Sequence, residues 1–165
     1  MSFKEKMFSY VVKHWYLKDC VIYSKRTGRA VSFPGVGNGG YLYTNVRFDG
    51  GCYKIQQHIA IYMLHHNRPV SDHKDIHHID GNPRNNAPEN LVELTRRQHM
   101  RIHAYQCDDP LRGIRFVGNV WRFSWNDNDG IGHSRDFHGI NEAMKFRAEI
   151  EEPYRAELRA LGLDC

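Results

Sequence analysis

A turn-forming run between two pairs of histidines is the feature that most constrains the fold. It spans residues 75–103 and reads DIHHIDGNPRNNAPENLVELTRRQHMRIH. His77 and His78 are adjacent before the loop, and His99 and His103 are four residues apart after it. The Asn, Asp, Gly and Pro residues between them favour a turn over a helix or strand. Any fold for the chain therefore has to account for histidines at both ends of one loop.

The second histidine pair lies on a predicted helix. Thr95 and Gln98 have the spacing of a capping box, which predicts a helix that begins near Arg96. His99 and His103 are then one turn apart on the same face. Two imidazoles at this spacing are a common way for a helix to bind one metal ion, although such a pair alone more often has no metal.

The first pair lies on a predicted strand. If residues 76–79 are extended, His77 and His78 point to opposite faces. One histidine can then bind the ion that the helix holds, while the other stays available to accept a proton. This division suits hydrolysis, because a metal polarises a phosphoryl oxygen and a neutral imidazole, with an ordinary pKa near ~6.5, deprotonates water.

The whole stretch resembles the HNH nuclease motif, also called the ββα-metal finger. That family carries HH or DH on a first strand, then a loop, then an Asn that opens N-L-x-x-L-T, with a metal ligand nine residues after the Asn. The matching residues here are His77-His78, NLVELT from Asn90, and His99, with His103 as the further ligand of the HH…N…HxxxH branch. The resemblance implies that His77, His99 and His103 bind one ion. It also implies that His78 is the general base and that Asn90 fastens the loop to orient it.

Three imidazoles form a borderline-soft ligand set, which prefers Zn, Ni, Co or Mn to Mg. Members of the resembled family nonetheless work with several divalent ions. We therefore expect one bound divalent ion (Mg, Mn, Co, Ni or Zn), with Mn or Co supporting cleavage at least as well as Mg.

The segment before the motif is similar to the one found in phage and intron-encoded homing endonucleases. It reads GYLYTNVRFDGGCYKIQQHIAIYMLHH, with one predicted hairpin around DGG and then a buried helix that ends at Arg68-Pro69. That family usually has His-Arg at the end of the strand, whereas this chain has His58-Ile59. We therefore predict a structural role for His58. Further upstream, Phe3, Met7, Val11 and Trp15 predict a helix, and CVIYS and RAVSF predict a hairpin around KRTG.

The C-terminal part is predicted to form three short strands and a helix, with Asn141 as the N-cap. It resembles the AP2-like DNA-binding domain in GIRF, WRFSW, DFHG and the helix that starts with EA. That domain binds DNA through its sheet. A small packing domain is the alternative, since residues 110–165 hold 8 Lys and Arg against 9 Asp and Glu.

Residues 1–109 are mildly basic, with 15 Lys and Arg against 10 Asp and Glu, which suits a polyanionic partner. The side chains predicted to contact DNA lie on the N-terminal hairpins, on the motif helix and in the C-terminal part; ordinary solvated faces are the alternative for the first two groups. They are Arg26, Arg29 and Arg47; Arg96, Arg97 and Arg101; and Arg112, Arg115, Trp121, Arg122 and Arg135.

Together these observations predict an α+β protein. We expect an N-terminal helix and hairpin region with DNA contacts at 1–51, an HNH nuclease core at 52–107 and an AP2-like DNA-binding unit at 110–165. No apolar run approaches the ~20 residues that cross a bilayer, and the start lacks an apolar signal core, so we expect a cytoplasmic protein, in the host cell if a phage encodes it.

The function predicted is a metal-dependent endonuclease that hydrolyses phosphodiester bonds of double-stranded DNA, of the phage or mobile-element homing type, and a homodimer if both strands are cut. The alternative is a non-catalytic zinc-binding DNA-binding protein, with His73 or Asp75 as a fourth ligand. A metal enzyme with another substrate is disfavoured by the basic body and the lack of an HExxH motif.

Overall fold

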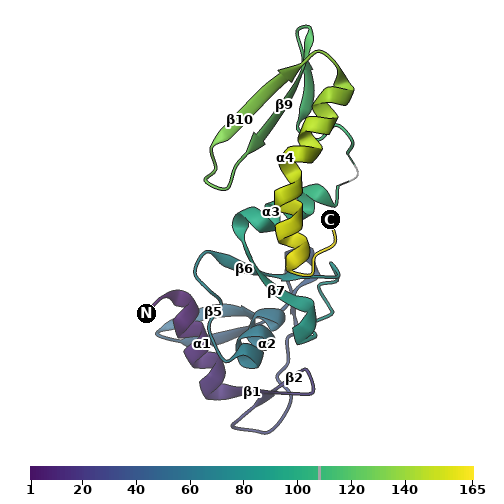
Figure 1. The fold of residues 1–165 in the computed structure, drawn as a ribbon. Helices are drawn as coiled ribbons and strands as arrows, with labels where there is room; N and C mark the ends of the chain where they lie inside the picture. Colours follow the sequence, from purple (N-terminus) through teal and green to yellow (C-terminus); the bar gives the residue numbers. More distant parts are fainter. Residues whose placement is uncertain (108) are drawn as a thin grey trace. The chain divides into compact units, whose positions relative to one another are not determined.

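Helix α1 (Phe3–His14) is the first element of the computed structural model, which describes residues 1–107 and 109–165 (Figure 1). A capping box between Ser2 and Glu5 closes its N-terminus. Met7 and Val11 are buried as the stripe predicts, but Phe3 is 48% exposed. The helix ends at His14 because the next residue, Trp15, has an extended backbone (φ −128°, ψ 159°).

The first predicted hairpin is confirmed only in part. The predicted partner segment pairs with β2 (Val21–Ser24) through one antiparallel bridge, Tyr23 with Ala30, and two backbone hydrogen bonds, from the Ser24 N–H to the Arg29 carbonyl (2.9 Å) and from the Val31 N–H to the Ile22 carbonyl (2.8 Å). The full strand partner of β2 is instead β1 (Trp15–Lys18), which was not predicted. The chain reverses at Asp19-Cys20, where both residues have positive φ (49° and 60°). Neither residue is glycine, so the sequence lacks the usual indication of a turn with positive φ at this position.

The second predicted hairpin is confirmed. Strands β4 (Leu42–Phe48) and β5 (Gly51–Gln56) are antiparallel and are joined at Asp49-Gly50, where φ is positive at both residues (49° and 75°), as in a type I′ turn. A short strand, β3 (Gly35–Val36), pairs with β4 on its other side, which gives the order β3-β4-β5.

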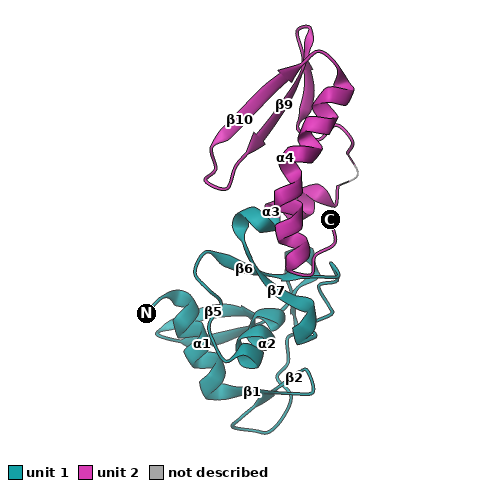
Figure 2. Cartoon of the chain, in the orientation of Figure 1, with its two compact units in different colours: residues 1–99 teal, residues 100–165 magenta. Residues whose placement is uncertain are grey.

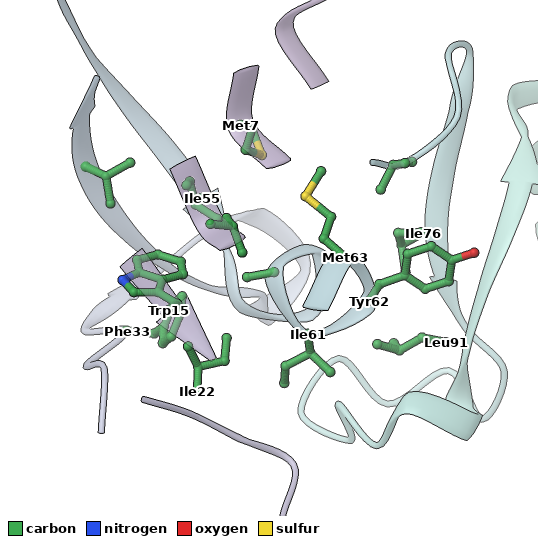
Figure 3. Close-up of a cluster of buried hydrophobic side chains, with 14 residues drawn as sticks. Met7, Trp15, Ile22, Phe33, Ile55, Ile61, Tyr62, Met63, Ile76 and Leu91 are labelled. Carbon is green, nitrogen blue, oxygen red and sulfur yellow. The ribbon is translucent and has the colours of Figure 1, made fainter. Parts of the chain in front are cut away.

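Helix α2 (Gln57–His66) supplies much of the first hydrophobic core, as its apolar sequence predicts. It ends at Asn67, a left-handed C-cap just before Arg68-Pro69. The core gathers side chains from α1, the hairpins, α2 and the strands that follow (Figure 3). These include Met7, Trp15, Ile22, Ile55, Ile61, Met63, Ile76 and Leu91.

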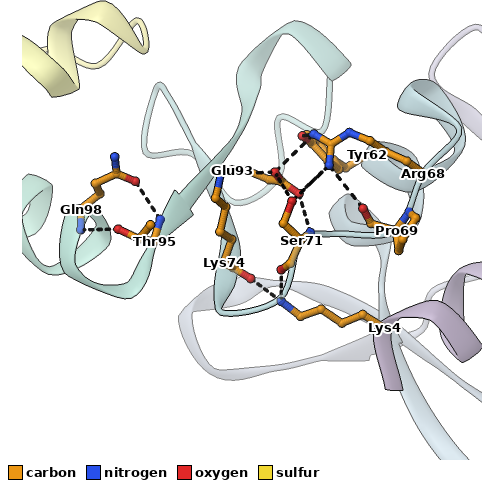
Figure 4. Close-up of polar contacts among 9 residues, drawn as sticks. All are labelled: Lys4, Tyr62, Arg68, Pro69, Ser71, Lys74, Glu93, Thr95 and Gln98. Atoms are coloured by element: carbon orange, nitrogen blue, oxygen red, sulfur yellow. Dashed lines mark hydrogen bonds and ion pairs between the residues drawn. The ribbon is translucent and has the colours of Figure 1, made fainter. Parts of the chain in front are cut away.

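The histidine-rich stretch forms two antiparallel strands and a helix, in the order ββα. They are β6 (Lys74–His78), β7 (Leu91–Thr95) and α3 (Arg96–Tyr105), with a short 3₁₀ turn, η2 (Pro88–Asn90), before β7. The predicted capping box is confirmed: the Thr95 N–H donates to Gln98 Oε1 (2.8 Å) and the Gln98 N–H to Thr95 Oγ1 (3.2 Å) (Figure 4).

A polar network around Glu93 ties the end of α2 to β7 (Figure 4). The largely buried carboxylate accepts two hydrogen bonds from the Arg68 guanidinium (3.0 and 3.2 Å) and two from Ser71 (2.8 and 3.1 Å). Arg68 also donates to the Tyr62 hydroxyl (2.6 Å). Burial raises the pKa of the Glu93 carboxyl, but these hydrogen bonds outweigh burial and leave the pKa below its usual value. This network therefore stabilises the fold least at acidic pH.

The chain divides into two compact units, residues 1–99 and residues 100–165 (Figure 2). This division falls inside α3, whereas the sequence predicts boundaries near residues 52 and 110. That three-part division stays a prediction. Across the described residues, no helix is both long and apolar enough to span a membrane.

The second unit contains the predicted three strands and helix. Strands β8 (Ile114–Val117), β9 (Val120–Asn126) and β10 (Gly132–Phe137) form a sheet in the order β10-β9-β8. Helix α4 (Ile140–Ala160) packs on the sheet through Phe146 and the buried Ala143. The predicted N-cap is wrong, because the extended backbone of Gly139 precedes the helix and Asn141 is already helical.

Candidate functional site

The register of β6 on β7 sends the two adjacent histidines to opposite faces of the hairpin. His77 pairs with Val92 and His78 with Leu91. The His77 ring meets the His99 ring on α3, with centroids 5.0 Å apart and an interplanar angle of 68°. The His78 ring instead contacts the rings of Tyr41 and His58. The strand alternation expected from the sequence is therefore present.

The side chains of His77, His99 and His103 form a cluster of imidazoles. One nitrogen from each lies within 4.8 Å of the others. His77 is buried, His99 is half-buried and His103 is exposed. Because α3 is one uninterrupted helix, His99 and His103 are one turn apart on it. Three neutral imidazoles fit a divalent transition-metal ion and leave a coordination position open for another ligand.

His78 is 2% exposed, and its ring is held by hydrogen bonds that run through two amide side chains. Its Nε2 lies 2.8 Å from Asn86 Oδ1, and Asn86 Nδ2 donates to Gln57 Oε1 at 3.0 Å. His78 Nδ1 is buried and has no hydrogen-bond partner among the described residues. Asn86 and Gln57 are absent from the predicted site, since neither lies at a motif position and they are 29 residues apart in sequence.

The His58 ring packs against the His78 ring, with centroids 5.0 Å apart, and against the Tyr41 ring, with centroids 4.8 Å apart. It is 4% exposed. Burial, and secondarily the nearby His78, lower the pKa of His58 to about 3. A ring that stays neutral and buried at ordinary pH fits the structural role predicted for His58.

Asn90 fastens the loop between the two strands. Its Oδ1 accepts from the Asp80 N–H (3.0 Å), and its Nδ2 donates to Asp80 Oδ1 (2.9 Å) and to the Asn85 carbonyl (2.8 Å). Asn85 Nδ2 and the Asn82 N–H also donate to the Asp80 carboxylate (2.7 and 2.9 Å). Hydrogen bonds from Asn85, Asn82 and Asn90 lower the pKa of Asp80 to about 2. Asn90 therefore holds the loop, whereas Asn86 contacts the His78 ring directly.

Asn90→Ala should raise the pKa of Asp80 from about 2 toward its ordinary value of 3.8, because one donor to the carboxylate is lost. A carboxyl with a lowered pKa stabilises the fold fully above its ordinary pKa and loses that contribution as the pH falls through about 2. An NMR titration of the Asp80 side-chain carbonyl measures the change. Asn82→Ala is the control, since it keeps the backbone donor. An unchanged pKa in Asn90→Ala would contradict this account of the loop.

Two arginines predicted to contact DNA take part in contacts inside the second unit. Arg101 donates to Asn128 Oδ1 (2.6 Å) and lies over the Tyr154 ring (3.6 Å). Arg112 forms a bidentate ion pair with the buried Glu151 (2.8 and 2.9 Å) and donates to the Ala104 carbonyl. These contacts hold α3 against α4, so both side chains have a structural role whatever else they bind.

The predicted residues of the C-terminal sheet are split between its two faces. Arg115 pairs with Arg122, on the face opposite the buried Ile114 and Phe123. Arg122 also forms an ion pair with Asp136 (2.6 Å). The others lie on the helix side, with Arg135 over the Phe146 ring (4.6 Å) and Trp121 in the strand register of Phe137.

The remaining predicted contacts lie at or near the surface of the first unit. Arg26, Arg29, Arg47 and Arg96 are exposed, and Arg97 is half-buried. Their positions are open to a large ligand, and their contact with DNA stays a prediction.

The segment that contains this site matches a known protein family. Residues 56–101 match the family model described as HNH endonuclease. Over these residues the chain is similar to HNH endonucleases. The matched part contains His77, His78, Asn90 and His99, and it ends two residues before His103. The prediction of a nuclease is thus confirmed by the match over this segment.

The chain is also similar to one solved structure, described as "DNA binding and cleavage by the HNH homing endonuclease I-HmuI". The similarity has 16% sequence identity and a TM-score of 0.46, and it covers 81% of this chain and 76% of that one. No curated protein matches this sequence.

Proposed function

We propose that the protein is a metal-dependent endonuclease that hydrolyses phosphodiester bonds of double-stranded DNA, of the phage or mobile-element homing type. The observation that carries the proposal is the separation of the adjacent histidines. His77 joins an imidazole cluster with His99 and His103, while His78 lies on the other face of the same strand. Metal-dependent hydrolysis of a phosphodiester can use two such groups, one that binds an ion and one that accepts a proton.

In this site, His77, His99 and His103 would hold the ion, which when bound supplies charge stabilisation to the phosphate and to the leaving 3′ oxygen. His78 takes the proton of the attacking water, which leaves hydroxide to form the new bond to phosphorus as the bond to the 3′ oxygen breaks. Asn90 keeps the loop rigid so that the His78 ring stays in place.

DNA is the proposed substrate because exposed arginines flank the site in sequence and the first 109 residues carry excess positive charge. Arg96 and Arg97 at the start of α3 would contact phosphates beside the scissile bond. The AP2-like C-terminal unit would add DNA contacts through the open sheet face that carries Arg115 and Arg122.

A non-catalytic zinc finger is the competing function. Structural zinc sites normally have four protein ligands. Among the described residues the cluster has three histidines, and the two earlier candidates for a fourth ligand, His73 and Asp75, do not belong to it. An open position favours a catalytic site.

Nicking of supercoiled plasmid tests the proposed function. The purified protein should nick DNA after addition of divalent ions and lose this activity in EDTA. Mn or Co should support nicking at least as well as Mg, because imidazole nitrogens bind these ions better. Strict dependence on Mg would contradict a three-imidazole site. DNA binding without cleavage by any ion would favour the zinc finger.

A further inference from the structure

We infer that Asn86 and Gln57 set the tautomer of His78, so that Nδ1 is the nitrogen that accepts the proton. This inference rests on the proposed function, because it assigns positioning residues to the base of that reaction. Neither residue belongs to the motif resemblance or to the loop-fastening role of Asn90.

The direction of the hydrogen bonds carries the inference. Asn86 Nδ2 donates to Gln57 Oε1 at 3.0 Å, so the amide oxygen of Asn86 faces His78 Nε2 at 2.8 Å. An amide oxygen only accepts hydrogen bonds. A neutral His78 ring therefore carries its hydrogen on Nε2 and has its lone pair on Nδ1.

The surroundings of Nδ1 agree with this assignment. Nδ1 of His78 is buried and meets no hydrogen-bond partner in the part of the chain that the structure describes. Buried polar atoms without partners are few in folded proteins, and those that persist often belong to functional sites. A lone pair at Nδ1 is what a general base for water requires.

The opposite tautomer would need both amides to turn together. Asn86 would then donate to Nε2 of His78, and Gln57 would donate to Asn86. That arrangement leaves the hydrogen of Nδ1 buried without an acceptor, which is rarer than an unsatisfied acceptor. The arrangement of these three side chains therefore favours the hydrogen on Nε2.

The arrangement also links the base to a rigid element. Gln57 is the first residue of α2, whose following residues belong to the first hydrophobic core. Asn86 lies in the loop between β6 and β7. Through these two amides, the orientation of the His78 ring depends on α2 as well as on its own strand.

The tautomer can be measured without any cleavage. In a long-range ¹H–¹⁵N spectrum of histidine-labelled protein, the neutral His78 ring should show the hydrogen on Nε2. The His78 signal is assigned by its loss in His78→Ala. Asn86→Ala should give a mixture of tautomers, while Asn86→Asp keeps an acceptor for Nε2 and should keep the wild-type form. A wild-type His78 ring with its hydrogen on Nδ1 would overturn the inference.

Kinetics then test whether the tautomer matters. Asn86→Ala should lower the maximal nicking rate by roughly 10- to 100-fold, which is part of the 10²- to 10⁴-fold contribution of a general base, because His78 is kept but is no longer held in one tautomer. The plasmid concentration for half-maximal rate and the metal affinity should change by less than about twofold, because Asn86 contacts neither DNA nor ion in this account. Asn86→Asp should recover most of the rate. Asn45→Ala, an exposed position on β4, is the matched control.

The two readouts separate this inference from the proposed function. If wild type nicks DNA and Asn86→Ala nicks equally fast, the positioning role is wrong and the nuclease stands. If the spectrum shows hydrogen on Nε2 but wild type never nicks DNA, the assignment of the tautomer stands and the proposed reaction is wrong. Circular dichroism of each variant checks that it is folded.

Discussion

His78→Ala is expected to lower the rate of plasmid nicking by about 10²- to 10⁴-fold, the usual contribution of a general base. The variant should still bind metal and DNA, because His78 lies on the face of β6 opposite the cluster of His77, His99 and His103. Single-turnover nicking at saturating metal measures the rate, and a metal titration and a gel-shift assay measure the two affinities.

His65→Ala is the matched control for this experiment, since it removes an exposed histidine from the end of α2. It should nick plasmid at the wild-type rate. Because His78 is buried, its removal leaves a small cavity, so circular dichroism should accompany the assay. A folded His78→Ala that nicks DNA at the wild-type rate would show that another group accepts the proton.

His99→Ala should weaken metal binding by more than ~100-fold. Loss of a residue that only hydrogen-bonds to a metal ligand already lowers metal affinity by about 10- to 100-fold, and His99 is a proposed ligand itself. Helix α3 supplies two of the three proposed ligands, His99 and His103. Without His99, only His77 and His103 would remain to bind the ion. Nicking should fall in parallel at low metal concentration and recover in part as metal is raised. Competition with a calibrated chelator gives the affinity.

His138→Ala is the control for the metal experiment. This histidine is exposed in the second unit and lies outside the cluster. Its substitution should leave both the metal affinity and the nicking rate unchanged. Unaltered affinity in His99→Ala would show that the ion binds elsewhere, and the imidazole cluster would then lose its proposed role.

The parts of the site that follow from local rules were predictable from the sequence. A four-residue spacing places His99 and His103 on one helical face, and adjacent residues on a strand separate His77 from His78. The capping box at Thr95 likewise depends on a spacing of three residues. Each of these features needs only the residues nearest to it.

Features that depend on distant residues were not predictable in the same way. Gln57 and Asn86 meet only because the loop folds back toward the start of α2. The ion pair of Arg112 with Glu151 spans 39 residues, and nothing near Arg112 in sequence indicates that its charge is used inside the protein. The β1–β2 hairpin was missed for a local reason, since Asp19-Cys20 turns with positive φ without a glycine.

Helix α3 begins in one compact unit and ends in the other. This limits how the chain can be recombined with related proteins. A graft at the division after residue 99 would interrupt the helix and separate His99 from His103. A different C-terminal unit would have to be joined after Tyr105, where the helix ends, so that His77, His99 and His103 all stay in the part that is kept. The exchangeable part of this protein is therefore shorter than its second compact unit.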